Sequence, residues 1–424
     1  MKRILIVSGR YQTENPYREL AIKRQFEASG YETVFALPDR TINEHGYEEG
    51  EITHNLCKKY GAVIIHSPQD FKQQVRLCDA VLFGSWKTYG SLAKIARTVG
   101  RPVLNFNSTS GLDHWPHYVD CAFVKGPFSK RQILYFQNII QGYGNLRENQ
   151  IIVTGSVAHE QEQTAKRDAL PITKDEFCDF YNFDASRPII TFFPKGIGSF
   201  AQKVGTWFKD STSAKKQEYN DQFIKKYFEI CKSVRDSDCN LLIKMHPTAY
   251  VSYKCKTDDE YAFWQKIPWA KILDPIHTYD CYRHTDCGIG INTHSSLDLG
   301  YFGKPFIYVD SDRFTPPDAV QFHINHLCSL PLGPSSHWDN VPLTQVNPWF
   351  PSWLGLFSRI ENLSYVLKTE LPLKIPEVQK NRFISEFWYK SDGKSSERIV
   401  DGSIEFINKY KPTLLQKIRG SMGI

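Results

Sequence analysis

Two segments place chemically versatile side chains directly after an apolar, strand-like run. In the first, the run 240–244 ends in Lys244 and is followed by His246 and Pro247. Because proline forces a turn, we expect the imidazole of His246 at the mouth of a cleft, where it can donate to a phosphate oxygen or protonate a departing phosphate near neutral pH. The structural alternative is a histidine that merely ends a strand, since His-Pro pairs are common in loops.

The second segment, 288–305, joins a strand to a hydroxyl-rich helix start. Thr293, Ser295 and Ser296 follow the strand, and Asp298 lies three residues after Ser295. Backbone N–H groups, hydroxyls and the positive end of the helix dipole would converge there, which predicts an anion-binding site. A plain capping box with Ser295 as the N-cap is the structural alternative, and the two can coexist because a capped helix keeps free N–H donors.

An alternation of short apolar strands and helical patterns must position these segments. In the first third of the chain, strands are predicted over 3–8, 33–37, 62–65, 80–83, 102–106, 121–124 and 151–154, with helices over 18–29, 91–99 and 129–141. A second series has strands over 188–193, 240–244, 287–291 and 305–309, with a helix over 221–235. This order predicts an α/β chain of two tandem Rossmann-like, doubly wound domains facing a central cleft, with ligands at the carboxyl ends of the strands.

The same pattern predicts where the domains begin and end. We expect an N-terminal Rossmann-like domain over 1–160 and a C-terminal Rossmann-like domain over 187–385. A helical segment over 386–424 is expected to pack back on the first domain.

Length and composition exclude several classes of protein. The chain has 424 residues, 41% of them apolar and 23% charged, which excludes a mainly disordered or fibrous protein. A net charge of +6 is too dilute over this length to indicate nucleic-acid binding, so no nucleic-acid partner is expected. The sequence has no Walker A motif, no complete dinucleotide fingerprint around the glycine pairs at 196–198 and 288–290, and no Gly-x-Ser-x-Gly elbow.

Cysteine usage and hydropathy predict a cytoplasmic chain. Ten cysteines occur without a Cys-x-x-Cys pair, which favours reduced, mostly buried thiols. No stretch approaches the roughly 18 apolar residues of a membrane span, and the short run after Met1 is typical of a strand rather than a signal peptide. The segment 406–424 alternates basic and apolar residues and could rest on the inner membrane leaflet as a peripheral contact. A frayed C-terminal helix is the structural alternative.

One spacing resembles a metal site. His277, Cys281, His284 and Cys287 have zinc-like spacing, but the segment reads as a short helix entering a buried strand, so the side chains would not converge on one point. The group of His323, His326 and Cys328 is weaker still. We expect no metal and no other cofactor.

A resemblance emerges from the order of these motifs. A strand ending in Lys-x-His-Pro, and about fifty residues later a strand, two serines, a helix and Gly-Lys-Pro, resemble the second domain of the GT-B transferases. The match is closest to the bacterial surface-polysaccharide branch: CDP-glycerol glycerophosphotransferases, capsule Kdo transferases, and bacterial sialyltransferases with His-Pro and Ser-Ser motifs. The resemblance implies that His246, Ser295 and Ser296 bind the phosphate of a nucleotide donor.

The resemblance extends along most of the chain, with two departures. Segments 151–156, 192–196 and 390–399 resemble the end of the first domain, the start of the second and the closing segment of the glycerophosphotransferases. Their Trp-His-Gly and Pro-Thr-x-Arg segments are missing, because this chain has other residues at 105–110 and 193–196. The turn 110–114 resembles the acidic turn of the non-hydrolysing UDP-sugar 2-epimerases.

The function expected from the resemblance is sugar transfer from a CMP-, CDP- or UDP-linked donor to a surface polysaccharide or lipid-linked glycan acceptor. A CDP-polyol phosphotransferase of the teichoic-acid type is the first alternative. A UDP-sugar 2-epimerase or hydrolase of the same fold is the second. A catalytically silent binding protein on this scaffold is the third.

Sugar transfer would require further groups in both domains. Asp113 is the candidate acceptor-side base, with His114 and His117 able to tune or replace it, although an Asp-His pair in a glycine-bearing loop is more often turn chemistry. Gly9 and Arg10, after the first strand, could approach the acceptor. On the donor side, Lys195 and Gly196 would join Lys244, His246, Pro247, Thr293, Ser295, Ser296 and Asp298 around the phosphate.

Overall fold

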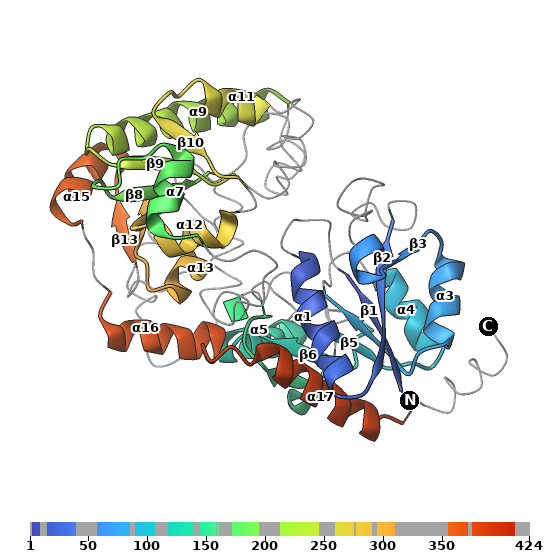
Figure 1. The fold of residues 1–424 in the computed structure, drawn as a ribbon. Helices are drawn as coiled ribbons and strands as arrows, with labels where there is room; N and C mark the ends of the chain where they lie inside the picture. The colour runs from blue at the N-terminus through green and yellow to red at the C-terminus, as the bar shows by residue number, and fades with distance from the viewer. Residues whose placement is uncertain are drawn as a thin grey trace. The chain divides into compact units, whose positions relative to one another are not determined.

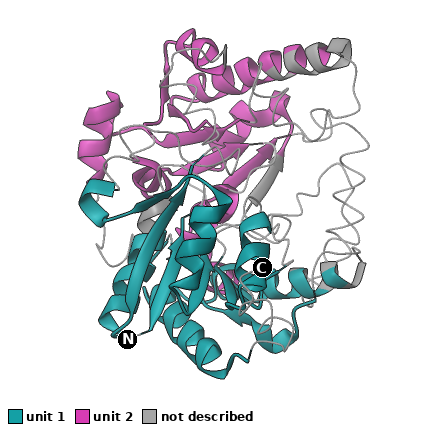
Figure 2. Cartoon of the chain, turned by 90° about the vertical axis from the view of Figure 1, so that its right-hand side faces the viewer, with its two compact units in different colours: residues 1–170, 384–424 teal, residues 171–383 magenta. Residues whose placement is uncertain are grey.

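A computed structural model describes most of the chain as two compact units. Unit 1 comprises 1–170 and 384–424, and unit 2 comprises 171–383 (Figures 1 and 2). The described residues are 2–8, 15–39, 57–84, 90–106, 118–139, 145–157, 159–160, 172–194, 213–245, 259–274, 277–290, 295–309, 355–371 and 375–411.

Unit 1 contains a parallel sheet of seven strands in the order β3-β2-β1-β4-β5-β6-β7. The strands are β1 (Arg3–Val7), β2 (Glu32–Pro38), β3 (Val63–Ile65), β4 (Ala80–Phe83), β5 (Val103–Phe106), β6 (Cys121–Val124) and β7 (Ile151–Val153). Its helices are α1 (Asn15–Ala28), α3 (Pro68–Arg76), α4 (Gly90–Thr98), α5 (Pro127–Ile139) and the 3₁₀ turn η2 (Glu148–Gln150). Strands β4, β5 and β6 are buried along their whole length, as expected for a parallel sheet covered on both faces.

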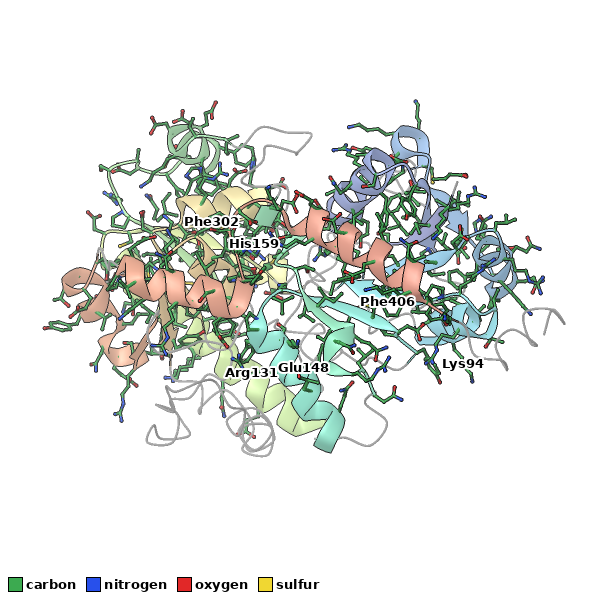
Figure 3. The ribbon with its side chains drawn as sticks, turned by 90° about the horizontal axis from the view of Figure 1, so that it is seen from below. Lys94, Arg131, Glu148, His159, Phe302 and Phe406 are labelled. Carbon is green, nitrogen blue, oxygen red and sulfur yellow. The ribbon has the colours of Figure 1, made fainter. Side chains whose placement is uncertain are left out.

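The C-terminal segment packs on unit 1. Helix α17 (Ser395–Lys409) lies against α1, and the π-helix η8 (Ile384–Trp388) lies against α5. The buried carboxylate of Glu160 accepts hydrogen bonds from the backbone N–H and the hydroxyl of Ser396, both at 2.6 Å. His159, labelled in Figure 3, packs edge-on against Trp388 with ring centroids 4.4 Å apart. These contacts tie the end of the chain to the residues that follow β7.

Unit 2 repeats the architecture with a parallel sheet in the order β10-β9-β8-β11-β12-β13. The strands are β8 (Ile189–Phe193), β9 (Asn240–Ile243), β10 (Ala270–Ile272), β11 (Cys287–Gly290), β12 (Phe306–Val309) and β13 (Gly355–Ser358). The helices are α7 (Lys174–Tyr181), α9 (Ser213–Arg235), α11 (Asp259–Gln265), α12 (Thr278–His284), α13 (Ser295–Tyr301), α15 (Leu363–Thr369) and α16 (Glu377–Phe383), with a 3₁₀ turn η7 (Ile360–Asn362).

Alternation along β9 separates two cores in unit 2. Leu241 and Ile243 point into a core that α9, α11 and α15 cover, whereas Leu242 points into a second core with α7 and α12. A Cβ on Gly288 of β11 would lie 2.3 Å from Leu299 Cδ1, so this glycine lets α13 pack closely on the sheet. The absence of a side chain at position 288 is therefore explained by packing.

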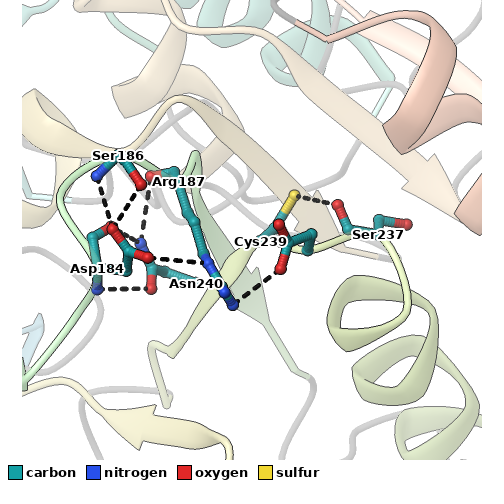
Figure 4. A network of polar contacts seen from close by, with 7 residues as sticks. Asp184, Ser186, Arg187, Ser237, Cys239 and Asn240 are labelled. Atoms are coloured by element: carbon teal, nitrogen blue, oxygen red, sulfur yellow. Dashed lines mark hydrogen bonds and ion pairs between the residues drawn. The ribbon is translucent and has the colours of Figure 1, made fainter.

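A polar network fixes the amino ends of β8 and β9 (Figure 4). The Asn240 side chain donates to Asp184 O at 2.7 Å and accepts from Asp184 N at 3.2 Å. Arg187 Nε lies 3.1 Å from Asp184 Oδ2 and forms an ion pair with it. Protein side chains and backbone groups thus satisfy one another's hydrogen bonds at the amino ends of β8 and β9.

The expected fold class is confirmed, because both units are doubly wound α/β sheets. In each unit the first six strands follow the order 3-2-1-4-5-6, and the order reverses between β1 and β4 and between β8 and β11. Ligands of such sheets bind outside the carboxyl ends of the strands at the point of reversal. Within the described ranges, no helix is both long and apolar enough to cross a membrane.

Candidate functional site

The carboxyl edge of the unit 2 sheet brings three strand ends together. Phe193, the last residue of β8, pairs with Gly290, the last residue of β11. On the other side of β8, the backbone N–H of Lys244 donates to Phe192 O at 2.9 Å, so the residue that follows β9 lies beside the end of β8. The sequence-predicted Lys244 therefore lies next to the reversal point of the sheet.

Lys244 is a buried cation, with only 6% of its surface exposed. Its ammonium lies 5.6 Å from the ring centroid of Tyr282 on α12. Among the described residues, no carboxylate forms an ion pair with it. Taking an ammonium out of water costs several kcal/mol unless a counter-charge is present, so this position favours an anionic ligand.

Ser295 lies at the same edge. The hydroxyl of Tyr282 donates to Ser295 Oγ at 3.2 Å, so Tyr282 is in contact with both Lys244 and Ser295. Ser295 is half-buried and is the first residue of α13, one position later than the N-cap that a capping box would require.

Ser296 has a different environment from Ser295. It is fully buried, and its side chain interacts with the hydroxyl of Tyr308 on β12. Burial raises the pKa of Tyr308 far above its usual range, which keeps the phenol neutral. Asp298, the fourth residue of α13, is half-buried. The binding of a donor phosphate by Ser296 and Asp298 stays a prediction.

The Gly-Lys-Pro segment lies at the other edge of the sheet. Lys304 precedes β12, and burial lowers its pKa, an effect that Asp286 partly opposes. Asp286 precedes β11, accepts from Ile189 N at 2.9 Å and lies 3.5 Å from the ammonium of Lys174. The buried Lys244 and the half-buried Lys304 thus lie at opposite ends of the strands.

The four residues with zinc-like spacing have separate partners. His277 Nδ1 lies 3.3 Å from Asp280 Oδ2, and His284 Nε2 donates to Ile172 O at 2.8 Å. Cys281 Sγ lies 3.6 Å from Thr191 Oγ1, and Cys287 Sγ lies 3.4 Å from its neighbour's carbonyl. Burial raises the pKa of both thiols. No group of three or more metal-ligating side chains occurs within the described part of the chain.

Most of the other sequence candidates lie outside the described residues and stay predictions. They are Gly9, Arg10, Asp113, His114, His117, Lys195, Gly196, His246, Pro247, Thr293, His323, His326, Cys328 and the end of the tail, 412–424.

The carboxyl edge of the unit 1 sheet carries a carboxylate that sequence reasoning missed. Glu19 of α1 is fully buried, and a Cβ on Gly84, directly after β4, would lie 1.9 Å from Glu19 Oε1. Ser8, after β1, and Asn105, on β5, are also buried, and Asn105 Nδ2 donates to Phe83 O at 3.2 Å. In the sequence, Glu19 is one more charged residue of a helical pattern, and no local signal separates it from the others.

Comparison with known proteins identifies relatives only by structure. No protein-family model matches the sequence, and no curated protein does. The structure of S. aureus MnaA with UDP has 15% sequence identity and a TM-score of 0.54, and the match covers 97% of this chain and 99% of that one. The wall teichoic acid polymerase TagF has 12% identity and a TM-score of 0.56, with 96% and 89% covered. A UDP-GlcNAc 2-epimerase from Neisseria meningitidis has 12% identity and a TM-score of 0.53, with 96% and 100% covered.

These likenesses extend over nearly the whole chain. With the two doubly wound sheets, they show that the chain has the GT-B fold. At identities of this size, the likeness concerns the fold and does not fix the reaction.

Proposed function

We propose that this chain is a metal-independent glycosyltransferase that moves a sugar from a CMP-, CDP- or UDP-linked donor to a surface polysaccharide or lipid-linked glycan acceptor. In this proposal, Lys244 and Ser295 bind the donor phosphate at the carboxyl edge of the unit 2 sheet. Lys195, His246 and Thr293 would complete that site. Unit 1 would bind the acceptor and supply the base, for which Asp113 and His114 remain the candidates.

The observation that carries the proposal is the buried ammonium of Lys244 beside the reversal point of the sheet, with no carboxylate partner among the described residues. A nucleotide-linked donor would bring the missing negative charge. Cleavage of the sugar–phosphate bond adds charge to the departing nucleotide, so a cation already held at this place would stabilise the transition state more than the ground state. Lys244 would thus assist the departure of the nucleotide.

Two further observations support a nucleotide-linked donor. Structures with the same fold contain UDP, UDP-GlcNAc or, in a soaked TagF variant, CDPG. The His-Pro and Ser-Ser motifs of the families that this sequence resembles occur here at His246 and Ser295, after β9 and β11. Both motifs follow strands whose carboxyl ends flank β8.

A nucleotide panel tests the proposal. UDP, CDP, CMP and their sugar or polyol conjugates are added to the full chain, and the shift of the melting temperature is recorded, since a ligand that binds only the folded state stabilises it. We expect a shift with a uridine or cytidine nucleotide. Lys244→Met should abolish that shift. It should also leave the free chain as stable as wild type or more so, because it removes a buried charge that no carboxylate of the described residues pairs with.

The turnover products separate the alternatives. Sugar transfer predicts that donor is consumed only when an acceptor is present. Conversion of a UDP-sugar without acceptor would favour the epimerase or hydrolase, and turnover restricted to CDP-glycerol or CDP-ribitol would favour the polyol phosphotransferase. If no nucleotide shifts the melting temperature, the proposal is wrong and a binding protein becomes the better account.

A lipid-linked acceptor would place the enzyme at the inner face of the cell membrane, and the basic segment 406–424 would provide the peripheral contact. Sedimentation with vesicles of anionic lipid tests this part separately. Binding should be lost at high salt and after removal of 412–424, and equal binding of both chains would contradict it.

A further inference from the structure

Tyr282 connects the two polar groups of the proposed phosphate site. Its hydroxyl donates to Ser295 Oγ at 3.2 Å, and the Lys244 ammonium lies 5.6 Å from the centroid of its ring. The side chain is buried, and it lies on α12, an element that neither motif of the site contains. One side chain thus contacts both the residue that follows β9 and the residue that begins α13.

Two aromatic rings fix the Tyr282 ring in place. Phe193 at the end of β8 and Phe302 after α13 each have centroids 6.3 Å from the Tyr282 centroid, with interplanar angles of 13° and 21°. Figure 3 labels Phe302 in unit 2. Three nearly parallel rings therefore join the end of β8, helix α12 and the residue after α13. Such offset stacking holds a ring more firmly than burial alone.

We infer that Tyr282 is a positioning residue of the proposed donor site, which holds the Lys244 ammonium through its ring and the Ser295 hydroxyl through its own hydroxyl. The inference rests on the proposed function, because it takes Lys244 and Ser295 as phosphate ligands. Tyr282 does not contact the phosphate itself. Its contribution is to fix two flexible groups before the ligand arrives, so that less conformational entropy is lost on binding.

Two substitutions separate the two contacts. Tyr282→Phe removes the hydrogen bond to Ser295 and keeps the ring beneath Lys244, so we expect UDP or CDP to bind about five- to tenfold more weakly. Tyr282→Leu removes the ring as well, and the loss should grow to about 30-fold or more. Calorimetric titration with UDP and CDP measures both dissociation constants on the full chain.

Tyr181 provides a matched control in the same unit. It is a buried tyrosine whose hydroxyl accepts a hydrogen bond from Asp274 N at 3.0 Å. Tyr181→Phe should lower the free energy of unfolding about as much as Tyr282→Phe and leave nucleotide affinity unchanged. A purely structural role of Tyr282 predicts that the two variants behave alike in both measurements.

A double-mutant cycle provides a readout that a general loss of stability would not move. If Tyr282 acts through Ser295, Tyr282→Phe should have no further effect on nucleotide affinity in a Ser295→Ala background. Additive losses would overturn the inference, and so would unchanged affinity in Tyr282→Phe. If Tyr282→Leu does not fold, Tyr282→Phe and the double-mutant cycle still test the inference, since Tyr282→Phe retains the aromatic ring and its packing.

The outcomes also separate this inference from the proposed function. If wild type binds none of UDP, CDP and CMP, both are wrong. If wild type binds one of them and Lys244→Met does not, while both Tyr282 variants bind like wild type, only the positioning role is wrong. Weaker binding in Tyr282→Phe but not in Tyr181→Phe, together with the non-additive cycle, would support both.

Discussion

Both sheets arrange their first six strands in the same order, yet different ionisable side chains are buried beside the points where the strand order reverses. In unit 1 the carboxylate of Glu19 occupies the space above Gly84, directly after β4. In unit 2 the ammonium of Lys244 follows β9 and lies beside the end of β8. The fold determines where a ligand can bind, and the buried charge determines which ligand is favoured there.

In the proposed reaction, this difference would place the two substrates on different units. The Lys244 ammonium would attract phosphate, and the Glu19 carboxyl group can accept hydrogen bonds from hydroxyl groups. Unit 2 therefore suits the nucleotide donor. The edge of unit 1 is better suited to a hydroxyl-bearing acceptor.

The largest expected effect concerns the cation itself. Lys244→Met should weaken UDP or CDP binding about 100-fold, because truncating a buried charge that pairs with a ligand costs about 2–5 kcal/mol. Lys304→Met is the control, since it replaces a half-buried lysine of unit 2 at the opposite edge of the sheet, where burial lowers the lysine pKa. Calorimetry should show wild-type affinity for that control. Equal losses in both variants would contradict the assignment of the site to the carboxyl edge.

The second prediction concerns packing around the carboxylate of unit 1. Gly84→Ala would force a methyl group against Glu19, and overpacking of this kind costs about 1–3 kcal/mol of unfolding free energy. Gly90→Ala is the control, because a Cβ there meets no atom within 4 Å. Urea unfolding of both variants checks this. Nucleotide affinity should be unchanged in either variant, and a loss in Gly84→Ala would mean that the donor also depends on the unit 1 edge.

The paired serines provide the third prediction. Ser295→Ala should weaken nucleotide binding about tenfold and lower the free energy of unfolding by about 1 kcal/mol, because it removes a group of the proposed phosphate site and the acceptor of the Tyr282 hydroxyl. Ser296→Ala should leave nucleotide affinity unchanged and lower the free energy of unfolding by about 1–2 kcal/mol, since its fully buried hydroxyl interacts with Tyr308. Calorimetric titration and urea unfolding of both variants check this. Equal losses of nucleotide affinity in the two variants would contradict the prediction and mean that both serines bind phosphate.

The smallest effect concerns a surface charge pair of unit 1. Arg398 contacts both oxygens of Asp392, at 2.9 and 3.0 Å, and these hydrogen bonds lower the pKa of the carboxyl group. A lowered pKa means that the folded state favours the carboxylate, so this stability is present above the unfolded pKa and is lost as pH falls through the folded pKa. Asp392→Asn should cost less than about 1 kcal/mol at neutral pH, because solvent screens the pair.

Urea unfolding as a function of pH checks this last prediction. The difference between wild type and Asp392→Asn should vanish once the pH lies below the folded pKa of Asp392. A difference that persists there would mean that the side chain stabilises unit 1 through something other than its charge.

The strands were the most predictable part of the molecule. Runs such as 80–83 and 121–124 are continuous apolar segments, because both faces of a parallel sheet are buried, and the observed β4 and β6 have the same bounds. Strands β10 and β13 escaped prediction. The three residues of β10 are half-buried and include Lys271, so they lack that apolar signal.

The proposed donor site was predictable only where a residue follows its strand directly. Lys244 and Ser295 could be predicted because each comes just after a buried strand or at the start of the next helix. Tyr282 could not, since its role depends on contacts with Phe193 and Phe302, which are 89 and 20 residues away in the sequence. Glu19 was missed for the same reason, because only the fold brings it over Gly84.

The most direct test of the account is an experimental structure of the chain in complex with UDP or CDP. The account predicts a phosphate oxygen within hydrogen-bond distance, about 3 Å, of both Lys244 Nζ and Ser295 Oγ. A nucleotide phosphate bound at the edge next to Lys304, or beside Glu19 in unit 1, would contradict it.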